Sequence, residues 1–448
     1  MNDNICFPTA IGCDVHQKTL VCHCKQYSGE NIVDSKAIFS TNYNDLPNFV
    51  NWCASFNPNA ILLESTGVYW LSPFEALEQA NLPVSIVNPA HVKRMIGRKT
   101  DTADAEWLAK VGTMGTFTPS FIPSKEFRDL RMVSRNITKL TDIKQSFKNR
   151  ENKLFVVAGY RLHVFSDQFG KAATLAKDLI LAGKTPEEIV TAIRKLKTKR
   201  LKATNEELLN AFHGKLTPSI RMIIDDCRAI IQFLDAQIQS QTEFLINEVK
   251  RLDETSFRLV LTIPGISELT AATILVEYGG GENFIAHFSN AKRAASWSGM
   301  CPGNNESGGK RFSGKSRKGN KALRRAYCES AQAAIKTKNT TLRSTYDSLV
   351  GRLGFKRAVF AIGNKICQLV YCVLSHHSPY NDPQIDYQAI ACKRNAPRWL
   401  KAIKEYKDWE VTIRNKETGD VFTTADQTGQ HIYTGIAKFK NRNNNSQQ

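Results

Sequence analysis

The sequence has no long apolar stretch and no paired cysteines. No run approaches the ~18 to 20 apolar residues that span a membrane, and the chain does not open with a basic segment followed by an apolar one. The 11 cysteines include no Cys-x-x-Cys pair, and Cys22 and Cys24 around His23 fit alternation along a strand better than zinc ligation. We therefore expect free thiols and a soluble, cytoplasmic protein without membrane contact.

Acidic residues are scarce relative to basic ones. The 61 Lys and Arg outnumber the 42 Asp and Glu, which gives a formal charge of +19 and a pI near 9.4. A surface this basic attracts phosphate backbones and gains free energy from counterion release, so nucleic acid is the first partner to consider. The 448 residues fit two to four domains, and 42% of them are apolar, enough to form real cores.

The positive charge is absent from the N-terminal part. Residues 1–120 hold 8 Lys or Arg against 11 Asp or Glu, so the excess of basic residues lies downstream. This distribution indicates a carboxylate-rich site near the N-terminus and a nucleic-acid-binding surface in the later parts.

Apolar patterns in the N-terminal part predict strands alternating with helices. A helical periodicity over residues 68–80 separates short apolar runs that are typical of buried strands. An α/β sheet follows, in which functional side chains gather at the carboxyl ends of strands. The predicted strands are residues 10–15 and 19–24, joined by a turn at 16–18, then 60–64 and 83–87.

Four carboxylates occupy the places where such a sheet carries chemistry. Asp14 and Glu64 fall at strand ends, and a helix opening near residue 100 turns Asp101 and Asp104 the same way because they are three residues apart. Four acids are the inventory for two Mg²⁺ ions, with Mn²⁺ as an alternative, that clamp the attacking and leaving oxygens in phosphoryl transfer. Taken singly, each acid has a structural alternative as a turn cap, an ion pair or a helix N-cap.

Two long amphipathic helices are predicted in the middle of the chain. Residues 125–158 and 219–252 carry apolar side chains at helical spacing between charges. They are expected to pair as a coiled coil that serves as a spacer and dimerisation arm, with a plain helical bundle as the alternative. A helical, Lys-rich insertion lies between them, around residues 185–209.

The C-terminal part is predicted to be mainly helical. Residues 261–275 resemble a helix-hairpin-helix, whose turn presents backbone N–H groups to a phosphate, although Ser267 replaces the usual second Gly. Helices are expected over residues 318–336 and 356–374, and the polar end at 441–448 is expected to be disordered.

A basic, glycine-rich stretch over residues 303–325 is the second candidate site. Its 23 positions hold eight Lys or Arg, five Gly and three Ser. The glycines allow the backbone to approach a phosphate, and the cations offset its charge. The residues leave three nucleophiles open, namely Ser307, Ser313 and Ser316, and a solvated basic turn is the alternative. The cations proposed to bind nucleic acid are Lys310, Arg311, Lys315, Arg317, Lys318 and Arg324.

These motifs together resemble a known family, the DEDD insertion-sequence transposases of the IS110 and IS1111 groups. The likeness runs in the family's order over about residues 8–375. The motifs that carry it are residues 11–16, 63–70, 87–90, 97–105, 263–266, 306–311 and 318–320. The resemblance assigns the family's metal ligands to Asp14, Glu64, Asp101 and Asp104, and its serine to Ser307.

The resemblance also implies a fold and an activity. The fold is α/β + α, with a RuvC/RNase H-like mixed sheet domain, a helical coiled-coil middle and a mainly helical transposase domain. The activity is cleavage and exchange of donor and target DNA strands through a transient serine–DNA phosphodiester. A noncoding bridge RNA is implied as the guide, and a homo-oligomer, dimer or tetramer, with composite active sites. The expected domains are residues 8–122, 123–255, 256–375 and a C-terminal extension over 376–448.

Two departures from the family and two rival functions accompany this interpretation. An insertion around residues 160–218 lengthens the middle region, and the tail after His376 has no counterpart. The rival enzyme is a metal-dependent nuclease of the Holliday-junction type, which uses the four acids and water without a serine intermediate. The rival without catalysis is a nucleic-acid-binding protein whose carboxylates are structural.

Overall fold

The computed structural model describes most of the chain. The described residues are 6–28, 31–64, 67–88, 101–196, 201–303, 305–314, 316, 318–387, 390, 394–395, 412–414, 419 and 421–423; only the backbone is described at 101–103, 305–306, 311–313, 412–413 and 421–423. The chain forms two compact units. Unit 1 comprises Met1–Leu245 and Val276–His287, and unit 2 comprises Ile246–Leu275 and Phe288–Gln448.

A five-stranded mixed sheet organises the start of unit 1. Its order is β3-β2-β1-β4-β5, with β1 antiparallel to β2 and parallel to β4. The strands are β1 (Thr9–Val15), β2 (Thr19–Ser28), β3 (Asn31–Ser40), β4 (Ala60–Glu64) and β5 (Val84–Val87). This confirms the predicted α/β class with a mixed sheet. The edge strand β3 was not predicted, because its mostly exposed residues lack the apolar pattern of a buried strand.

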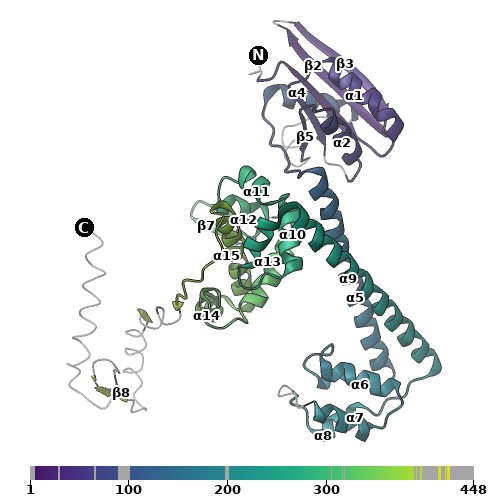
Figure 1. The fold of residues 1–448 in the computed structure, drawn as a ribbon, viewed down its shortest axis with the longest axis vertical. Coiled ribbons are helices and arrows are strands. Elements are labelled where there is room, and N and C mark those ends of the chain that lie inside the picture. Colours follow the sequence, from purple (N-terminus) through teal and green to yellow (C-terminus); the bar gives the residue numbers. More distant parts are fainter. Residues whose placement is uncertain are drawn as a thin grey trace. The chain divides into compact units, whose positions relative to one another are not determined.

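Helices cover both faces of this sheet (Figure 1). Helices α1 (Leu46–Ser55) and α2 (Leu71–Gln79) cover one face, where their apolar side chains join Ile11, Cys13 and Leu63 in a core. Helix α4 (Asp101–Met114) covers the other face, where Leu108 and Val111 pack with Leu62 and Val87. Because side chains alternate along a strand, the even-numbered residues of β1 and β4 face α4.

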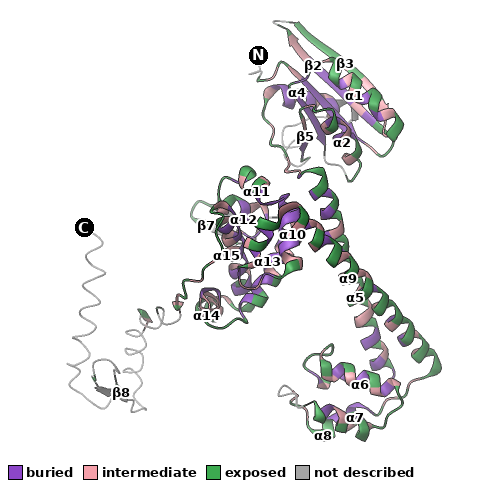
Figure 2. Ribbon diagram, in the orientation of Figure 1, coloured by how far each residue is buried: buried purple, intermediate pink, exposed green. Residues whose placement is uncertain are grey.

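The two long middle helices form an antiparallel pair. Helix α5 (Lys125–Val157) and helix α9 (Pro218–Leu261) are linked by Asn136–Gln241, Lys144–Asp235 and Glu151–Arg228 contacts. Buried and exposed positions alternate along both helices (Figure 2). The predicted helices and their pairing are confirmed, and α9 runs beyond the predicted end to Leu261, with a non-helical Asp253 inside.

The chain between α5 and α9 forms short helices that share a hydrophobic core with the ends of these two long helices. The short helices are η3 (Leu162–Val164), α6 (Lys171–Leu181), α7 (Pro186–Lys195) and α8 (Asn205–Ala211). Thr185 and Thr204 each begin a helix with a capping box, in which a Glu three residues later closes the pair of hydrogen bonds. Phe155, Leu162, Ile193 and Leu208 lie in the core of this region.

Unit 2 is built mainly from helices. They are the last part of α9, the first part of α10 (Glu268–Tyr278), α12 (Ala291–Trp297), α13 (Lys321–Ala334), α14 (Thr341–Leu353) and α15 (Phe355–Ser375); α11 (Gly281–His287) belongs to unit 1. Two hairpins, β6 (Asn305–Ser307) with β7 (Lys310–Ser313) and β8 (Thr412–Arg414) with β9 (Val421–Thr423), complete the described elements of this unit.

One helix corrects an expectation. By length and composition α15 is apolar enough to cross a membrane, with mean hydropathy 1.5 over an 18-residue window, so the expectation that no stretch approaches a membrane span was wrong. Half of that window is buried inside the structure, where Ile362, Ile366 and Val370 have no exposed surface. A helix that serves as the core of a helical unit acquires the same apolar composition.

Candidate active site

Asp14 and Glu64 occupy adjacent places at the carboxyl ends of β1 and β4. The parallel register pairs Cys13 with Leu63, and each acid is the next residue of its strand. Both carboxylates lie on the face covered by α4, two residues after Gly12 and Leu62. Both residues are buried, with 6% and 8% of their surface exposed. Two buried acids side by side at strand ends are the arrangement that the sequence predicted.

Helix α4 approaches β1 closely at Gly12. A Cβ on Gly12 would lie 2.2 Å from the carbonyl oxygen of Ala105, and a Cβ on Gly112 would lie 2.8 Å from the Cβ of Ala10. The helix therefore runs antiparallel to β1. Two residues of strand span about 7 Å, the length of four to five residues of helix. This geometry places the first turn of α4, which contains Asp104, at the level of Asp14.

The helix begins at Asp101, as predicted, and Asp104 is half-buried. The side chain of Asp101 lies outside the description, as do the backbones of the motif residues 65–66 and 89–100. The structure thus describes the carboxylates of Asp14, Glu64 and Asp104. For Asp101 it describes the position on the helix. Within the described side chains, no group of three His, Cys, Asp or Glu is close enough to hold a metal ion.

His16 is a neighbour of the acidic site that was not predicted as a functional residue. Its Nε2 lies 3.0 Å from Oδ2 of Asp14, and 42% of its side chain is exposed. The two residues are brought together by the turn that joins β1 to β2. An imidazole bonded to a carboxylate oxygen holds that carboxylate in one orientation. The spacing Asp-x-His at a strand end was the available signal in the sequence.

An ion-pair cluster ties the side of α4 to the sheet. Lys25 on β2 lies 3.0 Å from Asp34 on β3 and 3.5 Å from Glu106 on α4. The buried His23 donates from Nε2 to the same Asp34 at 2.8 Å. Partial burial raises the pKa of Asp34, but the contacts with His23 and Lys25 outweigh it and hold this pKa below its ordinary value. The cluster fixes α4, and with it Asp104, against the sheet.

The thiols near the site pack on the opposite face of the sheet. Cys13 and Cys22 are cross-strand partners, and Cys53 of α1 packs in the same core. Burial raises the pKa of the Cys13 thiol well above its ordinary value and also raises the pKa of the Cys22 thiol, so both thiols are uncharged. The predicted alternation of Cys22 and Cys24 along a strand is confirmed, because both lie in β2, opposite Cys13 and Ile11 of β1.

The basic stretch folds as a hairpin followed by a helix. Ser307 of β6 pairs with Lys310 of β7, and Gly308 and Gly309 form the two-residue turn with φ of +58° and +73°. Consecutive positive φ values define the tight hairpin turn that favours glycine at both central positions. Ser307 and Lys310 are both exposed, so the hydroxyl stands at the tip of the hairpin beside an ammonium group.

The other predicted residues of this stretch are only partly described. Ser316 is half-buried and Lys318 is exposed, whereas Lys315 and Arg317 lie outside the described residues. Only the backbone is described for Arg311 and Ser313, both on β7. Of the three candidate serines, Ser307 and Ser316 therefore have a described side-chain exposure, and Ser313 does not.

The side chain of Arg324 contacts other residues of unit 2. Its Nη2 donates to the carbonyl oxygen of Gly299 at 2.8 Å, and its guanidinium lies 5.9 Å from the ring centre of Phe360. Next to it, a Cβ on Gly319 would lie 2.3 Å from the backbone nitrogen of Gly299, and Asn320 caps α13. These contacts explain why α13 begins at Lys321, three residues after the predicted start.

The helix-hairpin-helix-like turn lies between α9 and α10. Gly265 has a φ of +91°, and a Cβ there would lie 2.3 Å from the carbonyl oxygen of Ser330 on α13. Ser267, which replaces the usual second Gly, accepts a hydrogen bond from the Thr270 backbone N–H at 3.3 Å. Close packing against α13 is thus a structural reason for Gly265.

Comparison with known families decides the identity of the chain. A transposase family model, the DEDD transposase of IS110, matches residues 11–157, which carry Asp14, Glu64, Asp101 and Asp104. A second model, described as transposase IS116/IS110/IS902 family, matches residues 257–347, which carry Ser307. The chain belongs to the IS110-type transposases.

Individual relatives of this transposase are distant in sequence. The transposase for insertion sequence element IS1111A of Coxiella burnetii is 23% identical over 339 residues, which cover 74% of this chain and 82% of the relative. The transposase for IS1328 of Yersinia enterocolitica is 23% identical over 379 residues, which cover 83% of this chain and 98% of the relative.

Among solved structures, RuvC of Thermus thermophilus is similar over a quarter of the transposase. The similarity has 16% sequence identity and a TM-score of 0.21, and it covers 99% of the RuvC chain. A complex of the same RuvC with a Holliday junction substrate gives 15% identity and a TM-score of 0.20.

Proposed function

We propose that this transposase cleaves and exchanges DNA strands with two chemical groups, the acids of unit 1 and Ser307 of unit 2. The observation that carries the proposal is the placement of Asp14 and Glu64 side by side at the carboxyl ends of β1 and β4, beneath the helix that carries Asp104. Both groups fall within the two family matches.

The carboxylates suit a divalent metal by their chemistry. Buried acids at strand ends are hard oxygen donors, and hard donors bind Mg²⁺ or Mn²⁺. Asp14, Glu64, Asp101 and Asp104 are the proposed ligands, and bound metal would offset charge on the scissile phosphate. His16 holds Asp14 in place from outside this set.

Ser307 is the proposed nucleophile of a transesterification. Its Oγ forms a bond to phosphorus while the bond from phosphorus to one DNA oxygen breaks, and the proton lost by the serine hydroxyl ends on that oxygen, which leaves as a DNA hydroxyl. The product is a serine–DNA phosphodiester, so the phosphodiester linkage is kept and not hydrolysed. A hydroxyl of a second DNA strand can then displace the serine. Lys310 across the hairpin turn supplies positive charge for the phosphate, and Lys315, Arg317, Lys318 and Arg324 are proposed to bind the DNA backbone with Arg311.

The serine is tested by its covalent adduct. A plasmid carrying the gene with its flanking DNA is the substrate, and denaturing gels detect labelled DNA bound to protein. We expect Ser307→Ala to abolish both recombination and the adduct, while Ser316→Ala retains them. An adduct that persists in Ser307→Ala would exclude this serine.

The acids are tested separately. Asp104→Ala is expected to bind DNA like the wild type but not to recombine it. Unchanged recombination would remove Asp104 from the site.

A nuclease of the Holliday-junction type is the alternative enzyme. It uses the same acids and water, so Ser307→Ala would still cut DNA without any adduct. The exposed hairpin that presents Ser307 beside Lys310 favours the serine mechanism.

The wider organisation is proposed on the family likeness. The functional parts are residues 8–122 for the acids, 123–255 as a dimerisation arm, 256–375 for the serine, and 376–448 as an extension. We propose a cytoplasmic homo-oligomer guided by a noncoding RNA, in which acids and serine from different subunits act on one DNA. Mixing Asp104→Ala with Ser307→Ala protein tests this, because shared sites restore recombination and separate sites do not.

A further inference from the structure

The insertion over residues 160–218 lies outside both family matches, which end at residue 157 and resume at 257. It holds 11 Lys or Arg against 6 Asp or Glu, so it is more basic than the chain as a whole. It also has a hydrophobic core, to which Phe155 of α5 and Ile224 of α9 contribute, and two capped helices, so it is a folded subdomain. A folded, basic addition to a DNA-acting chain calls for a function of its own.

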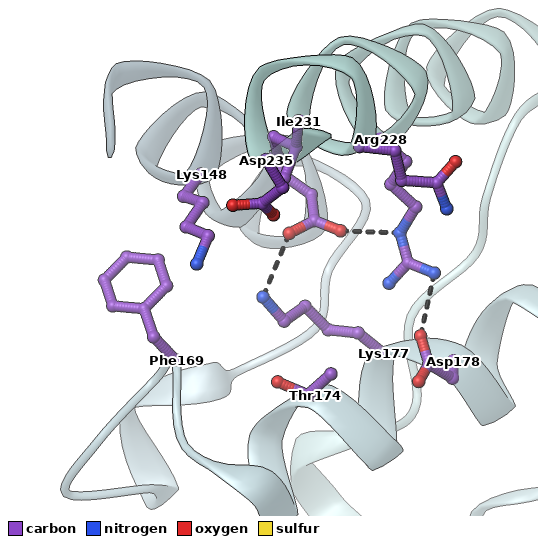
Figure 3. Close-up of a pocket in the computed structure, with 10 residues that line it drawn as sticks. Lys148, Phe169, Thr174, Lys177, Asp178, Arg228, Ile231 and Asp235 are labelled. Atoms are coloured by element: carbon purple, nitrogen blue, oxygen red, sulfur yellow. Dashed lines mark hydrogen bonds and ion pairs between the residues drawn. The ribbon is translucent and has the colours of Figure 1, made fainter. Parts of the chain in front are cut away.

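The insertion is fixed rigidly to the arm. Glu151 of α5 accepts from Lys177 of α6 at 3.0 Å and from Arg228 of α9 at 2.7 Å, and Arg228 also donates to Asp178 at 2.8 Å (Figure 3). Asn152 accepts a second bond from Lys177 at 2.9 Å. Lys177 and Glu151 are almost fully buried. Because Lys177 and Arg228 both have carboxylate partners, this network is structural.

A cavity between η3 and α8 is lined by cations that have no carboxylate partner among the described residues. It has a volume of about 520 Å³, and its lining includes Arg161, His163, Lys202, Glu207 and Asn210. The side chains of Arg161, His163 and Lys202 are exposed, and within the described part of the chain none of them has a hydrogen bond or ion pair. Glu207 is the one acid in the lining, and its carboxylate accepts from the Thr204 backbone N–H at 2.7 Å as part of the capping box.

The backbone holds these groups in one place. The Arg161 N–H donates to the carbonyl oxygen of Ala211 at 2.9 Å, which joins the start of η3 to the end of α8. Lys202 precedes α8 and closes a run in which six of nine residues, 194–202, are Lys or Arg; residues 197–200 lie outside the description and are not part of the site. The nearby Arg194 is engaged with Asn205 and the carbonyl of Ala203.

We propose that this cavity, lined by Arg161, His163 and Lys202, binds the phosphodiester backbone of a nucleic acid strand. Two unpaired cations, an imidazole and the Asn210 amide are donors that match phosphate oxygens, and the volume is within the ~300–1,000 Å³ typical of ligand sites. The apolar lining is only Val164 and two alanines, too little for a protein partner's anchor. The proposal rests on the proposed function, since it adds a second contact to the same nucleic acid substrates.

The salt dependence of binding by the full chain tests the proposal. The variants are Arg161→Gln with Lys202→Gln, and Arg161→Glu with Lys202→Glu. The control is Lys171→Glu, an exposed lysine of α6 outside the cavity lining. The probes are a 30-base-pair duplex DNA and a 30-nucleotide single-stranded RNA of unrelated sequence. Thermal unfolding of each variant verifies that the fold is retained.

Each lost phosphate contact lowers the slope of log K against log salt by about 0.9 on duplex DNA and about 0.7 on a single strand. We expect both double variants to lose about two contacts on one probe, and that probe identifies the source of the phosphates. Equal slopes for the double variants and Lys171→Glu on both probes would overturn the proposal. If the wild type binds neither probe, that result contradicts the proposed function instead. Ser307→Ala should bind the probes as the wild type does, because binding at the cavity does not require the catalytic serine.

Discussion

Gly12 of β1 lies against the backbone of Ala105 on α4, so closely that a Cβ would stand 2.2 Å from the Ala105 carbonyl oxygen. This contact sets the distance between the strand that carries Asp14 and the helix that carries Asp104. It gives the glycine of the first sequence motif a positioning role in the acidic site.

We predict that Gly12→Ala moves α4 away from the sheet. Overpacking of this kind costs roughly 1–3 kcal/mol, and a displacement of about 1 Å at a catalytic group lowers rates roughly 10²-fold. DNA cleavage should therefore fall while DNA binding remains. Gly351→Ala is the matched control, because no atom lies within 4 Å of the added Cβ inside α14. Equal cleavage by the two variants would show that the contact does not position the site.

His16→Ala should weaken the affinity of the acidic site for metal. The substitution removes the 3.0 Å contact with Asp14, and loss of such a partner typically weakens metal affinity 10- to 100-fold. The measurement is the Mg²⁺ concentration that gives half-maximal cleavage, which should rise. Lys18→Ala, in the same exposed turn, is the control. A Mg²⁺ dependence identical to the control would leave His16 without this role.

Gly308→Ala should slow formation of the serine adduct without changing global stability. The residue has a φ of +58°, which costs a residue with a Cβ about 1–2 kcal/mol, and no atom lies within 4 Å of the added group. The strain is therefore confined to the hairpin that presents Ser307. Gly308→Asn should retain more activity, since Asn tolerates this conformation. Equal adduct rates for Ala, Asn and wild type would mean that the turn is not rate-determining.

Lys177→Met should destabilise unit 1 by about 3–5 kcal/mol, because Glu151 keeps its burial and loses one of its two cations. Chemical denaturation monitored by circular dichroism measures the loss. Lys184→Met is the control, because its pair with Glu188 is exposed and contributes little to stability. Similar losses in both variants would contradict the structural importance of the buried network.

Asp382 should make the stability of unit 2 depend on pH. Partial burial raises the pKa of this carboxyl, but hydrogen bonds from Thr341 and from the Gln384 backbone outweigh it and hold the pKa below its ordinary value. A depressed folded pKa means that the stabilisation is complete above the unfolded pKa of about 3.9 and is lost as the pH falls through the folded value.

The check for Asp382 is a comparison of unfolding with Asp382→Asn. The wild type should be more stable at pH 7, and the difference should shrink toward pH 2.5. Glu329→Gln, which removes a mostly exposed pair with Arg325, should change stability little at either pH. A difference that does not vary with pH would contradict the assigned pKa direction.

The sequence by itself determined the local structure and the chemistry of this protein. The apolar pattern placed strands at residues 60–64 and 83–87 and the two long helices, because backbone geometry fixes the spacing of buried side chains. Acids at the strand ends were equally readable, since strand ends have local signals, whereas the hairpin turn at Gly308 and Gly309 was not predicted.

Only the tertiary structure decided which faces meet. The edge strand β3 is held by pairing with β2, a contact that its own exposed residues do not encode. Three contacts join groups on different elements or across a turn. They are the approach of Gly12 to Ala105, the hydrogen bond between His16 and Asp14, and the hydrogen bond from Arg324 to Gly299. Such contacts depend on how whole elements pack, because the free energy of packing belongs to the assembled core and not to any one segment.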